Sequence, residues 1–330
     1  MPPRPQLRLA TRGSPLALWQ ARRVAGMLAD RAQRDDSAAA EVTLVIVETT
    51  GDRNTDAPLH TLGGQGVFSK EVQAAVLRGD ADAAVHSAKD LPAAPDLSPE
   101  GLVLAAFPER ADPSDLLVGG HWDTLPPGAT VATGSVRRRT QLANLRPDLT
   151  YTDLRGNMGT RLAAVGRGDV VALIVAKAAV DRLGWEPPDG VETEVLDRML
   201  MVPQVGQGAL AVECRTGDAA TRAQLSSIDD AVIRRTVTAE RAYLAALGGG
   251  CTLPVGAYAE EVSDEPGSDV ELIAILASED GRVVLRHTAR GNDPERLGAD
   301  VARYLLDDCG GAALGSWGDG DGEGTAEAVP

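Results

Sequence analysis

A strand–turn–helix pattern occurs twice in this chain, and it restricts the possible folds more than any other feature. The two stretches are "LRLATRGSPLALWQARR", from residue 7, and "ATVATGSVRRRTQLANL", from residue 129. In each, an apolar strand leads through a Gly-Ser step into a helix, with serine at the position that caps a helix N-terminus. A second pair, "RGDADAAVHSAK" and "RGDVVALIVAK", follows in the same order. The repeated order predicts an α/β fold with two similarly built α/β domains.

The last hundred residues have a different pattern. A long helical stretch, "DDAVIRRTVTAERAYLAALG", is followed by three alternating strand patterns and a further helix. This order predicts a small α+β domain at the C-terminal end. The stretch "MVPQVGQGALAVECR" reads as a strand that returns to the first domain. We expect these bounds: 1–105 with 209–228 for the first domain, 108–205 for the second, 229–313 for the third, and 314–330 for a disordered acidic tail.

Composition excludes several classes of partner. The formal net charge of −16 argues against general affinity for nucleic acid or for acidic membrane surfaces. The sequence contains no apolar run of the roughly 18 residues that span a bilayer. Its cysteines, Cys214, Cys251 and Cys309, form no CxxC pair, and "MPPRPQLRLATRG" lacks the apolar core of a signal peptide. We therefore expect a cytoplasmic protein.

Arginine and hydroxyl side chains gather at three turns that lead into helices. They are Arg12 and Ser14 at the first turn, Thr133, Ser135, Arg137 and Arg138 at the second, and Arg155 and Arg161 in "DLRGNMGTR". Helix N-termini attract anions, and guanidinium groups bind carboxylates in pairs of hydrogen bonds. Each residue alone could be a helix cap or a solvated surface charge. Together, at the carboxyl ends of strands, they predict a site for a ligand with several carboxylates.

Three further features bear on chemistry. Lys89 and Asp90 follow a strand in "VHSAKDLP", where the carboxylate could stabilise a cation or move a proton, although a solvated ion pair is the simpler reading. Cys251 stands in "GGGCTLPVG", and its glycines leave room for a group attached to the thiol, whereas Cys214 suits a buried strand. The four histidines show no metal-binding spacing, so no metal site is expected.

Seven segments, read in order, resemble the porphobilinogen deaminase (hydroxymethylbilane synthase) family from about residue 7 to 310. They are "LRLATRGSPLALWQ", "GGQGVFSKE", "ADAAVHSAKDLP", "VATGSVRRRTQL", "LRGNMGTRL", "VGQGALAVEC" and "GGGCTLPVGAY". The resemblance implies two α/β domains like those of periplasmic binding proteins, with a third domain that carries the cofactor loop. It implies a monomeric transferase that joins four porphobilinogen molecules, with loss of ammonia, into hydroxymethylbilane for tetrapyrrole (haem, porphyrin) biosynthesis.

The resemblance also assigns residues. Cys251 would hold a dipyrromethane cofactor through a thioether, and Asp90 would be the catalytic acid. Cofactor contacts would come from Lys89, Ser14, Thr133, Ser135, Arg137, Arg138, Arg161 and Gln207. Substrate contacts would come from Arg12, Gln20, Arg155, Arg182 and Phe68. Three positions depart from the family's pattern: Gly134 replaces a frequent serine, and Thr61 and Gln65 replace frequent lysines.

Two other functions fit parts of the sequence. A non-enzymatic two-lobed binding protein for an anionic small molecule would explain the arginines, but it needs neither a third domain nor Cys251. An amino-acid-biosynthetic or redox enzyme on a doubly wound sheet is suggested by "GQGALA", which fits the dinucleotide-binding pattern GxGxxA. That stretch continues as a strand where a dinucleotide-binding turn would start a helix, so the pattern lacks its required context.

Overall fold

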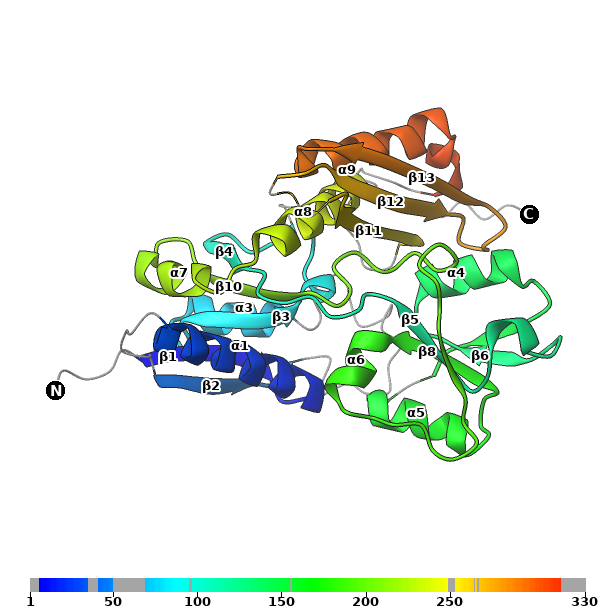
Figure 1. Ribbon diagram of the computed structural model, residues 1–330, viewed down its shortest axis with the longest axis horizontal. Coiled ribbons are helices and arrows are strands. Elements are labelled where there is room, and N and C mark those ends of the chain that lie inside the picture. The colour runs from blue at the N-terminus through cyan, green and yellow to red at the C-terminus, as the bar shows by residue number, and fades with distance from the viewer. Residues whose placement is uncertain are drawn as a thin grey trace, which may run out of the picture.

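The computed structural model describes residues 6–34, 41–49, 69–94, 97–154, 156–248, 253–263, 265 and 267–315. Within these ranges the chain forms two five-stranded sheets and one three-stranded sheet. Figure 1 shows the two larger sheets side by side with their helices, and the three-stranded sheet above them. Each sheet with its helices is called a domain below, numbered in chain order.

The first domain is a mixed sheet in the order β2-β1-β3-β10-β4. Its elements are β1 (Gln6–Arg12), α1 (Pro15–Arg34), β2 (Glu41–Val47), α3 (Lys70–Leu77), β3 (Ala83–Ser87), the 3-10 turn η2 (Ala88–Asp90), β4 (Leu102–Ala106), β10 (Leu210–Arg215) and α7 (Ala219–Ser226). Strands β1, β2 and β3 are parallel, and β10 lies antiparallel between β3 and β4. Alternate residues of β1, such as Leu7 and Leu9, are buried on one face against α1.

The second domain repeats this arrangement, with strand order β7-β6-β8-β5-β9. Its elements are β5 (Asp115–Val118), the 3-10 turn η4 (Trp122–Thr124), β6 (Thr130–Ala132), α4 (Val136–Leu145), β7 (Thr150–Thr152), α5 (Met158–Gly166), β8 (Ala172–Ala176), α6 (Lys177–Arg182) and β9 (Thr193–Val195). Strands β6, β7 and β8 are parallel, and β5 lies antiparallel between β8 and β9. Position by position, β5 corresponds to β10 of the first domain.

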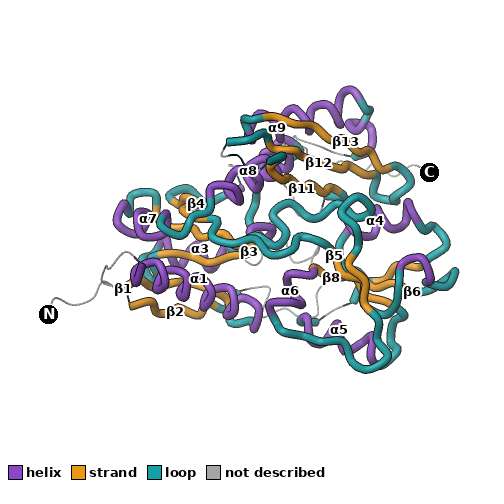
Figure 2. Tube along the Cα trace, viewed as in Figure 1, coloured by secondary structure: helices purple, strands orange, loops and turns teal. Residues whose placement is uncertain are grey.

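Two segments cross between these domains and pair with each other. The first follows β4 and the second precedes β10, and Figure 2 shows both as loops running between the sheets. The Ala111 N–H donates to the Gly208 carbonyl at 3.0 Å, and the Leu210 N–H donates to that of Glu109 at 2.9 Å. Gly208 has a φ of +84°, and a Cβ there would lie 2.3 Å from the Ala111 oxygen. Only glycine fits at that crossing.

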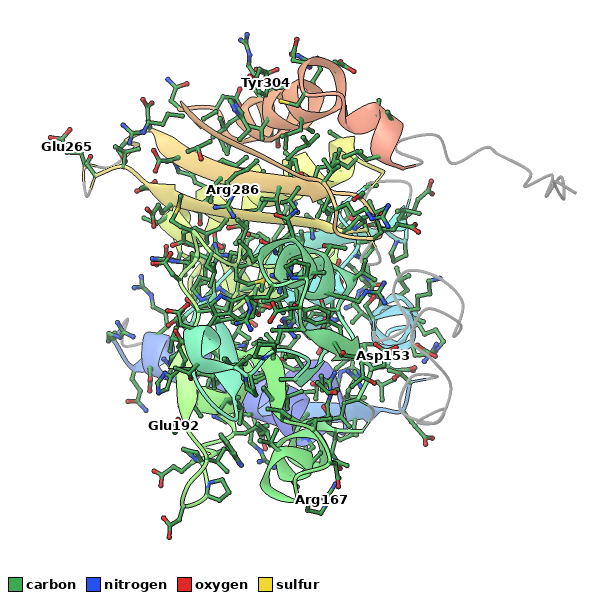
Figure 3. The ribbon with its side chains drawn as sticks, turned by 90° about the vertical axis from the view of Figure 1, so that its right-hand side faces the viewer. Asp153, Arg167, Glu192, Glu265, Arg286 and Tyr304 are labelled. Atoms are coloured by element: carbon green, nitrogen blue, oxygen red, sulfur yellow. The ribbon has the colours of Figure 1, made fainter. Side chains whose placement is uncertain are left out.

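The third domain is an antiparallel sheet, β11-β12-β13, packed against two helices. Its elements are α8 (Ala231–Ala246), β11 (Val255–Glu261), β12 (Val270–Ala277), β13 (Val284–Gly291), α9 (Pro294–Arg303), the π-helical turn η5 (Tyr304–Asp308) and the 3-10 turn η6 (Gly311–Leu314). The buried Tyr243 hydroxyl donates to the Ile275 carbonyl at 2.8 Å and ties α8 to β12. Seen from the side, Arg286 and Tyr304 mark this domain at one end of the molecule, and Arg167 marks the second domain at the other (Figure 3).

The predicted α/β class, with two alike domains and a small C-terminal α+β domain, is confirmed. The returning strand predicted in "ALAVEC" is β10, and its Cys214 is buried as expected. The short strands β4, β5 and β9 were not anticipated, because runs of three to five residues carry little periodicity. The predicted bounds of the domains stay a prediction. Of the predicted tail, 314–330, Leu314 ends the turn η6, and residues 316–330 lie outside the described residues.

Candidate functional site

A buried carboxylate, Asp115, gathers several of the predicted site residues. Asp115 opens β5 and is 0% exposed. Arg137 Nη2 approaches its Oδ2 at 2.8 Å, and Arg138 Nε donates to its Oδ1 at 2.9 Å. Gln207 Nε2 also donates to Oδ1 at 2.9 Å. We call these four residues the Asp115 cluster.

Local sequence explains why the two arginines point the same way. Strand β6 ends before Thr133, whose hydroxyl accepts the Ser135 N–H at 3.3 Å. Ser135 is the N-cap of α4, and its hydroxyl accepts the Arg138 N–H at 3.4 Å. Because α4 begins directly after Ser135, Arg137 and Arg138 both lie in its first turn, where Arg137 bonds to the Val202 carbonyl and Arg138 to the Ile174 carbonyl of β8.

The cluster holds more positive than negative charge. Burial by itself raises the pKa of Asp115, but Arg137, Arg138 and the Gln207 amide outweigh it and hold that pKa at about 2. Burial lowers the pKa of Arg137, which is 2% exposed. Arg137 Nη1 donates to the Val202 carbonyl at 2.6 Å, while its Nε has no hydrogen-bond partner among the described residues. Two guanidinium groups thus share one carboxylate and retain donors for a further anion.

The Lys89–Asp90 turn lies next to this cluster. Both side chains are half-buried in η2, directly after β3. Burial lowers the pKa of Lys89 to about 8; Arg138 and Arg137 also lower it, while Asp90 and Asp115 oppose the change. The Lys89 ammonium group therefore interacts electrostatically both with Asp90 in the same turn and with the arginines of the Asp115 cluster.

The crossover segment holds the turn in position. The Ala88 N–H donates to the Ala209 carbonyl at 2.9 Å. A Cβ at Gly206 would lie 3.1 Å from the backbone nitrogen of Lys89, so the turn packs directly on that glycine. Gln207, between these residues in sequence, reaches the Asp115 cluster. One short segment therefore sets the distance between the Lys89–Asp90 turn and the arginines.

The third domain contacts both parts of the site. Arg241 Nη2 on α8 donates to the Pro92 carbonyl, just after the turn, at 2.8 Å. A Cβ at Gly256 of β11 would lie 3.2 Å from Arg137 Cδ. Glu240, which is 0% exposed, accepts Arg110 Nη1 at 2.7 Å and the Gly206 N–H at 2.7 Å. The domain that carries Cys251 is thus fixed against the turn and the cluster.

Other predicted residues lie around this centre. Arg161, in the first turn of α5, donates from Nε to the Leu154 carbonyl at 3.2 Å, and its Nη2 would lie 3.7 Å from a Cβ at Gly134. Ser14 caps α1, accepting the Ala17 N–H at 3.3 Å. Arg12 ends β1 and is half-buried, and Gln20 is buried on α1.

Arg182 is not part of the Asp115 cluster. It ends α6, and its Nη2 donates to the Gly208 carbonyl at 2.7 Å. Its guanidinium carbon lies 5.3 Å from the centre of the Trp19 ring. Cys251, Arg155 and Phe68, with Thr61 and Gln65, lie outside the described residues.

Two charged residues of the site were missed in the sequence. Asp115 and Glu240 both stand in apolar surroundings, "SDLLVGG" and "VTAERAYL". An acidic residue within a buried pattern requires a cationic partner, and that requirement is the signal that could have singled them out. Which cation each meets depends on contacts 22 to 130 residues away in sequence, which no local pattern contains.

Metal ions and membranes would each require a recognisable feature of the structure. No group of three or more His, Cys, Asp or Glu side chains that could hold a metal ion is found among them. Within the same residues, none of the helices combines the length and apolar character needed to cross a bilayer.

Comparison with known proteins decides the family. A family model described as "Porphobilinogen deaminase, dipyromethane cofactor binding domain" matches residues 7–223, and one described as "Porphobilinogen deaminase, C-terminal domain" matches residues 234–307. The chain belongs to the porphobilinogen deaminase family. The resemblance seen in the seven segments is therefore confirmed.

Porphobilinogen deaminases from several bacteria align with most of the chain. The protein of that name from Syntrophus aciditrophicus is 41% identical over 306 residues, covering 91% of this chain and 95% of its own. That from Brevibacillus brevis is 40% identical over 302 residues, covering 91% and 93%. A Bordetella pertussis BvgS VFT2 domain shares 14% identity at a TM-score of 0.40, covering 68% of this chain and 86% of its own. The porphobilinogen deaminase matches favour the enzyme over a non-enzymatic binding protein.

Proposed function

We propose that this porphobilinogen deaminase is a hydroxymethylbilane synthase, a transferase that condenses four porphobilinogen molecules with loss of ammonia into a linear tetrapyrrole. The observation that carries the proposal is the Asp115 cluster beside the Lys89–Asp90 turn, in a chain matched by both family models. Every pyrrole unit of such a chain bears an acetate and a propionate group. An acidic protein that collects guanidinium groups in one place suits that ligand.

The described residues fit a dipyrromethane cofactor. Its carboxylates need fixed donors, and Lys89 in the turn, Arg138 in the Asp115 cluster and Arg161 beside Gly134 are cationic donors. The orphaned Nε of Arg137 is a buried donor, of the kind that a bound acceptor completes. Ser14, Thr133, Ser135 and Gln207 remain the predicted polar contacts. When bound, the cofactor supplies the fixed pyrrole end to which substrate units are added.

Attachment of the cofactor to Cys251 through a thioether agrees with the contacts of the third domain. Gly256 lies beside Arg137, and five residues of chain span at most about 18 Å. Helix α8, which precedes the cysteine loop, is bonded to Pro92 beside the catalytic turn. Residues on both sides of Cys251 in sequence, Arg241 before it and Gly256 after it, therefore contact the proposed site.

Asp90 is proposed as the catalytic acid. Loss of ammonia from the aminomethyl group of porphobilinogen leaves a cationic carbon, and a half-buried carboxylate stabilises such a charge more strongly than water does. The same group can protonate the departing amine and take up the proton released on condensation. Lys89, with a pKa of about 8, is mostly charged at neutral pH and can hold a substrate carboxylate nearby.

The remaining assignments are also proposals. Arg12, Gln20, Arg155, Arg182 and Phe68 are proposed to contact substrate. The enzyme is proposed to be a cytoplasmic monomer without nucleic-acid or membrane partners. The unpaired and buried Cys214 agrees with a reducing compartment.

Intact-mass spectrometry tests the attachment. We expect the purified active protein to carry the mass of two pyrrole units, and Cys251→Ser to lose both that mass and the activity. Cys309→Ser, at a half-buried free cysteine of the third domain, is the matched control and should keep both. Active protein with the mass of the bare polypeptide would reject the attachment.

The role of Asp90 is tested by Asp90→Asn. Because the stabilising charge is removed while shape is kept, we expect kcat to fall at least about a hundredfold with the cofactor mass unchanged. Asp80→Asn makes the same chemical change at an exposed residue of the first domain and should leave kcat unchanged. Turnover of Asp90→Asn within tenfold of wild type would contradict the assignment.

A further inference from the structure

Three buried polar side chains meet on one face of the first domain's sheet, where helix α3 packs against β3 and β10 (Figure 1). They are His86 of β3, Glu213 of β10 and Gln73 of α3, which are 6%, 6% and 2% exposed. In the antiparallel pairing of the two strands, Glu213 lies opposite Ala84, two residues before His86. Residues two apart on a strand share a face, so His86 and Glu213 are diagonal neighbours.

Glu213 contacts both of the other side chains. Gln73 Nε2 donates to Glu213 Oε2 at 2.9 Å, and His86 Nε2 lies 3.2 Å from the same oxygen. His86 Nε2 is buried and makes no aligned hydrogen bond to any described residue, so the nearby carboxylate is the group that compensates it.

The Glu213 carboxylate is charged although it is buried. Burial by itself raises its pKa, but His86 and Gln73 outweigh burial and lower that pKa below its ordinary value. Arg241 on α8 contributes further through its charge. Glu213 is therefore ionised at neutral pH, and it attracts groups from a neighbouring strand and from two helices.

These contacts lie on both sides of the Lys89–Asp90 turn. His86 belongs to β3, which runs directly into the turn. Arg241 Nη2 donates to the Pro92 carbonyl just after the turn at 2.8 Å. The charge of Glu213 thus acts on one residue before the turn and on another that is bonded to the chain after it.

Strand β10 also relates the turn to the Asp115 cluster. The segment 206–209 contacts the turn, reaches Asp115 through Gln207 and continues directly into β10. A shift of β3 along β10 would therefore move the turn relative to the cluster. The contact between His86 and Glu213 crosses this strand pair diagonally and opposes such a shift.

We propose that Glu213 and His86 are positioning residues for the reaction, which together hold the turn that carries Asp90 at its working distance from the Asp115 cluster. The inference rests on the proposed function and on the proposed role of Asp90. A buried charged group with its partner often stabilises a fold no more than apolar side chains of similar volume would. Stability alone therefore does not explain why this pair lies beside the turn.

Steady-state kinetics of Glu213→Gln and His86→Gln in the holoenzyme test the proposal. Glutamine keeps a side chain of similar length but removes the contact between carboxylate and imidazole. Because a misplacement of about 1 Å can cost about a hundredfold in rate, we expect kcat to fall about ten- to a hundredfold in each variant. The KM for porphobilinogen should change less than about threefold, and the cofactor mass should stay the same. The double variant should lose no more than the worse single variant, because both changes break one contact.

Glu261→Gln is the matched control. It makes the same chemical change at a residue that lies 3.1 Å from Arg235 in the third domain, with a side chain 9% exposed against 7% for Glu213. Glu261 ends β11, five residues beyond Gly256 and away from the end of the strand that touches Arg137. We expect this variant to lower Tm and to keep the wild-type kcat.

Three results would overturn the inference and leave the proposed function intact. They are a wild-type kcat in both single variants whatever their Tm, an equal fall of kcat in Glu261→Gln, and losses that multiply in the double variant. If Glu213→Gln does not fold, the comparison of His86→Gln with Glu261→Gln decides between positioning and general destabilisation. A wild-type protein that forms no hydroxymethylbilane from porphobilinogen would overturn the proposed function itself.

Discussion

Asp115→Asn is the substitution for which the structure predicts the clearest loss of stability. The asparagine keeps the shape of the aspartate but removes the only carboxylate to which Arg137 and Arg138 are bonded among the described residues. These arginines are 2% and 8% exposed, so water cannot replace the lost charge. Removing one partner of a buried ion pair costs about 3–5 kcal/mol of unfolding free energy, and we expect a loss in that range.

The pKa of Asp115 accounts for part of this loss. It is about 2 in the folded protein, against an ordinary value of 3.8, and the difference corresponds to about 2 kcal/mol of stability. Because the folded pKa is lowered, this contribution is fully present above the ordinary value and disappears as the pH falls from about 5 to 2. The rest of the expected loss comes from two buried guanidinium groups left without a counter-charge.

Urea denaturation followed by tryptophan fluorescence measures the effect. At pH 7 the unfolding free energy of Asp115→Asn should lie about 3–5 kcal/mol below that of wild type, and the gap should narrow toward pH 3. Asp148→Asn, which breaks an exposed pair with Arg146 in the same domain, is the control and should change little. A loss below about 1 kcal/mol at pH 7, or one equal to that of the control, would refute the reasoning.

Three further outcomes are expected. Gly208→Ala should lower Tm far more than Gly128→Ala. Both glycines have positive φ, but of the two only Gly208 would place the added Cβ 2.3 Å from a carbonyl oxygen. Equal losses of Tm in the two variants would contradict this close approach. Gly134→Ser should leave Tm and turnover nearly unchanged, because its Cβ meets only an arginine nitrogen at 3.7 Å, and a large drop in either would show that the departure from the family pattern matters. The rate at which an amine-acylating reagent modifies Lys89, read by peptide mass mapping, should rise with pH with a midpoint near pH 8, because the pKa of Lys89 is lowered to about 8. Exposed Lys70 serves as the reference, and a midpoint above pH 10 for Lys89 would contradict the lowered pKa.

Much of the fold could be predicted from local sequence. Strand β1, helix α1 and the cap at Ser135 follow from apolar periodicity and from serine before a helix, both of which act over a few residues. The repeated motif also predicts two alike domains, and the strand orders of the two sheets agree. Lys89 and Lys177 stand at similar places, the second residue after β3 and the first residue after β8.

The candidate site was only partly predictable. The sequence placed Arg137 and Arg138 at a helix start, but it suggested groups open to a ligand. The structure buries both against Asp115, a residue that no motif singled out.

The sequence by itself determined the longer strands and helices, the repeat, the helix caps and the family, because these depend on neighbouring residues and on ordered motifs. Only the tertiary structure decided which charges meet. Asp115 reaches arginines 22 and 23 residues away, and Glu240 reaches an arginine 130 residues away. The physical reason is that a buried charge is tolerated only beside its partner, and folding brings the two together from distant parts of the chain.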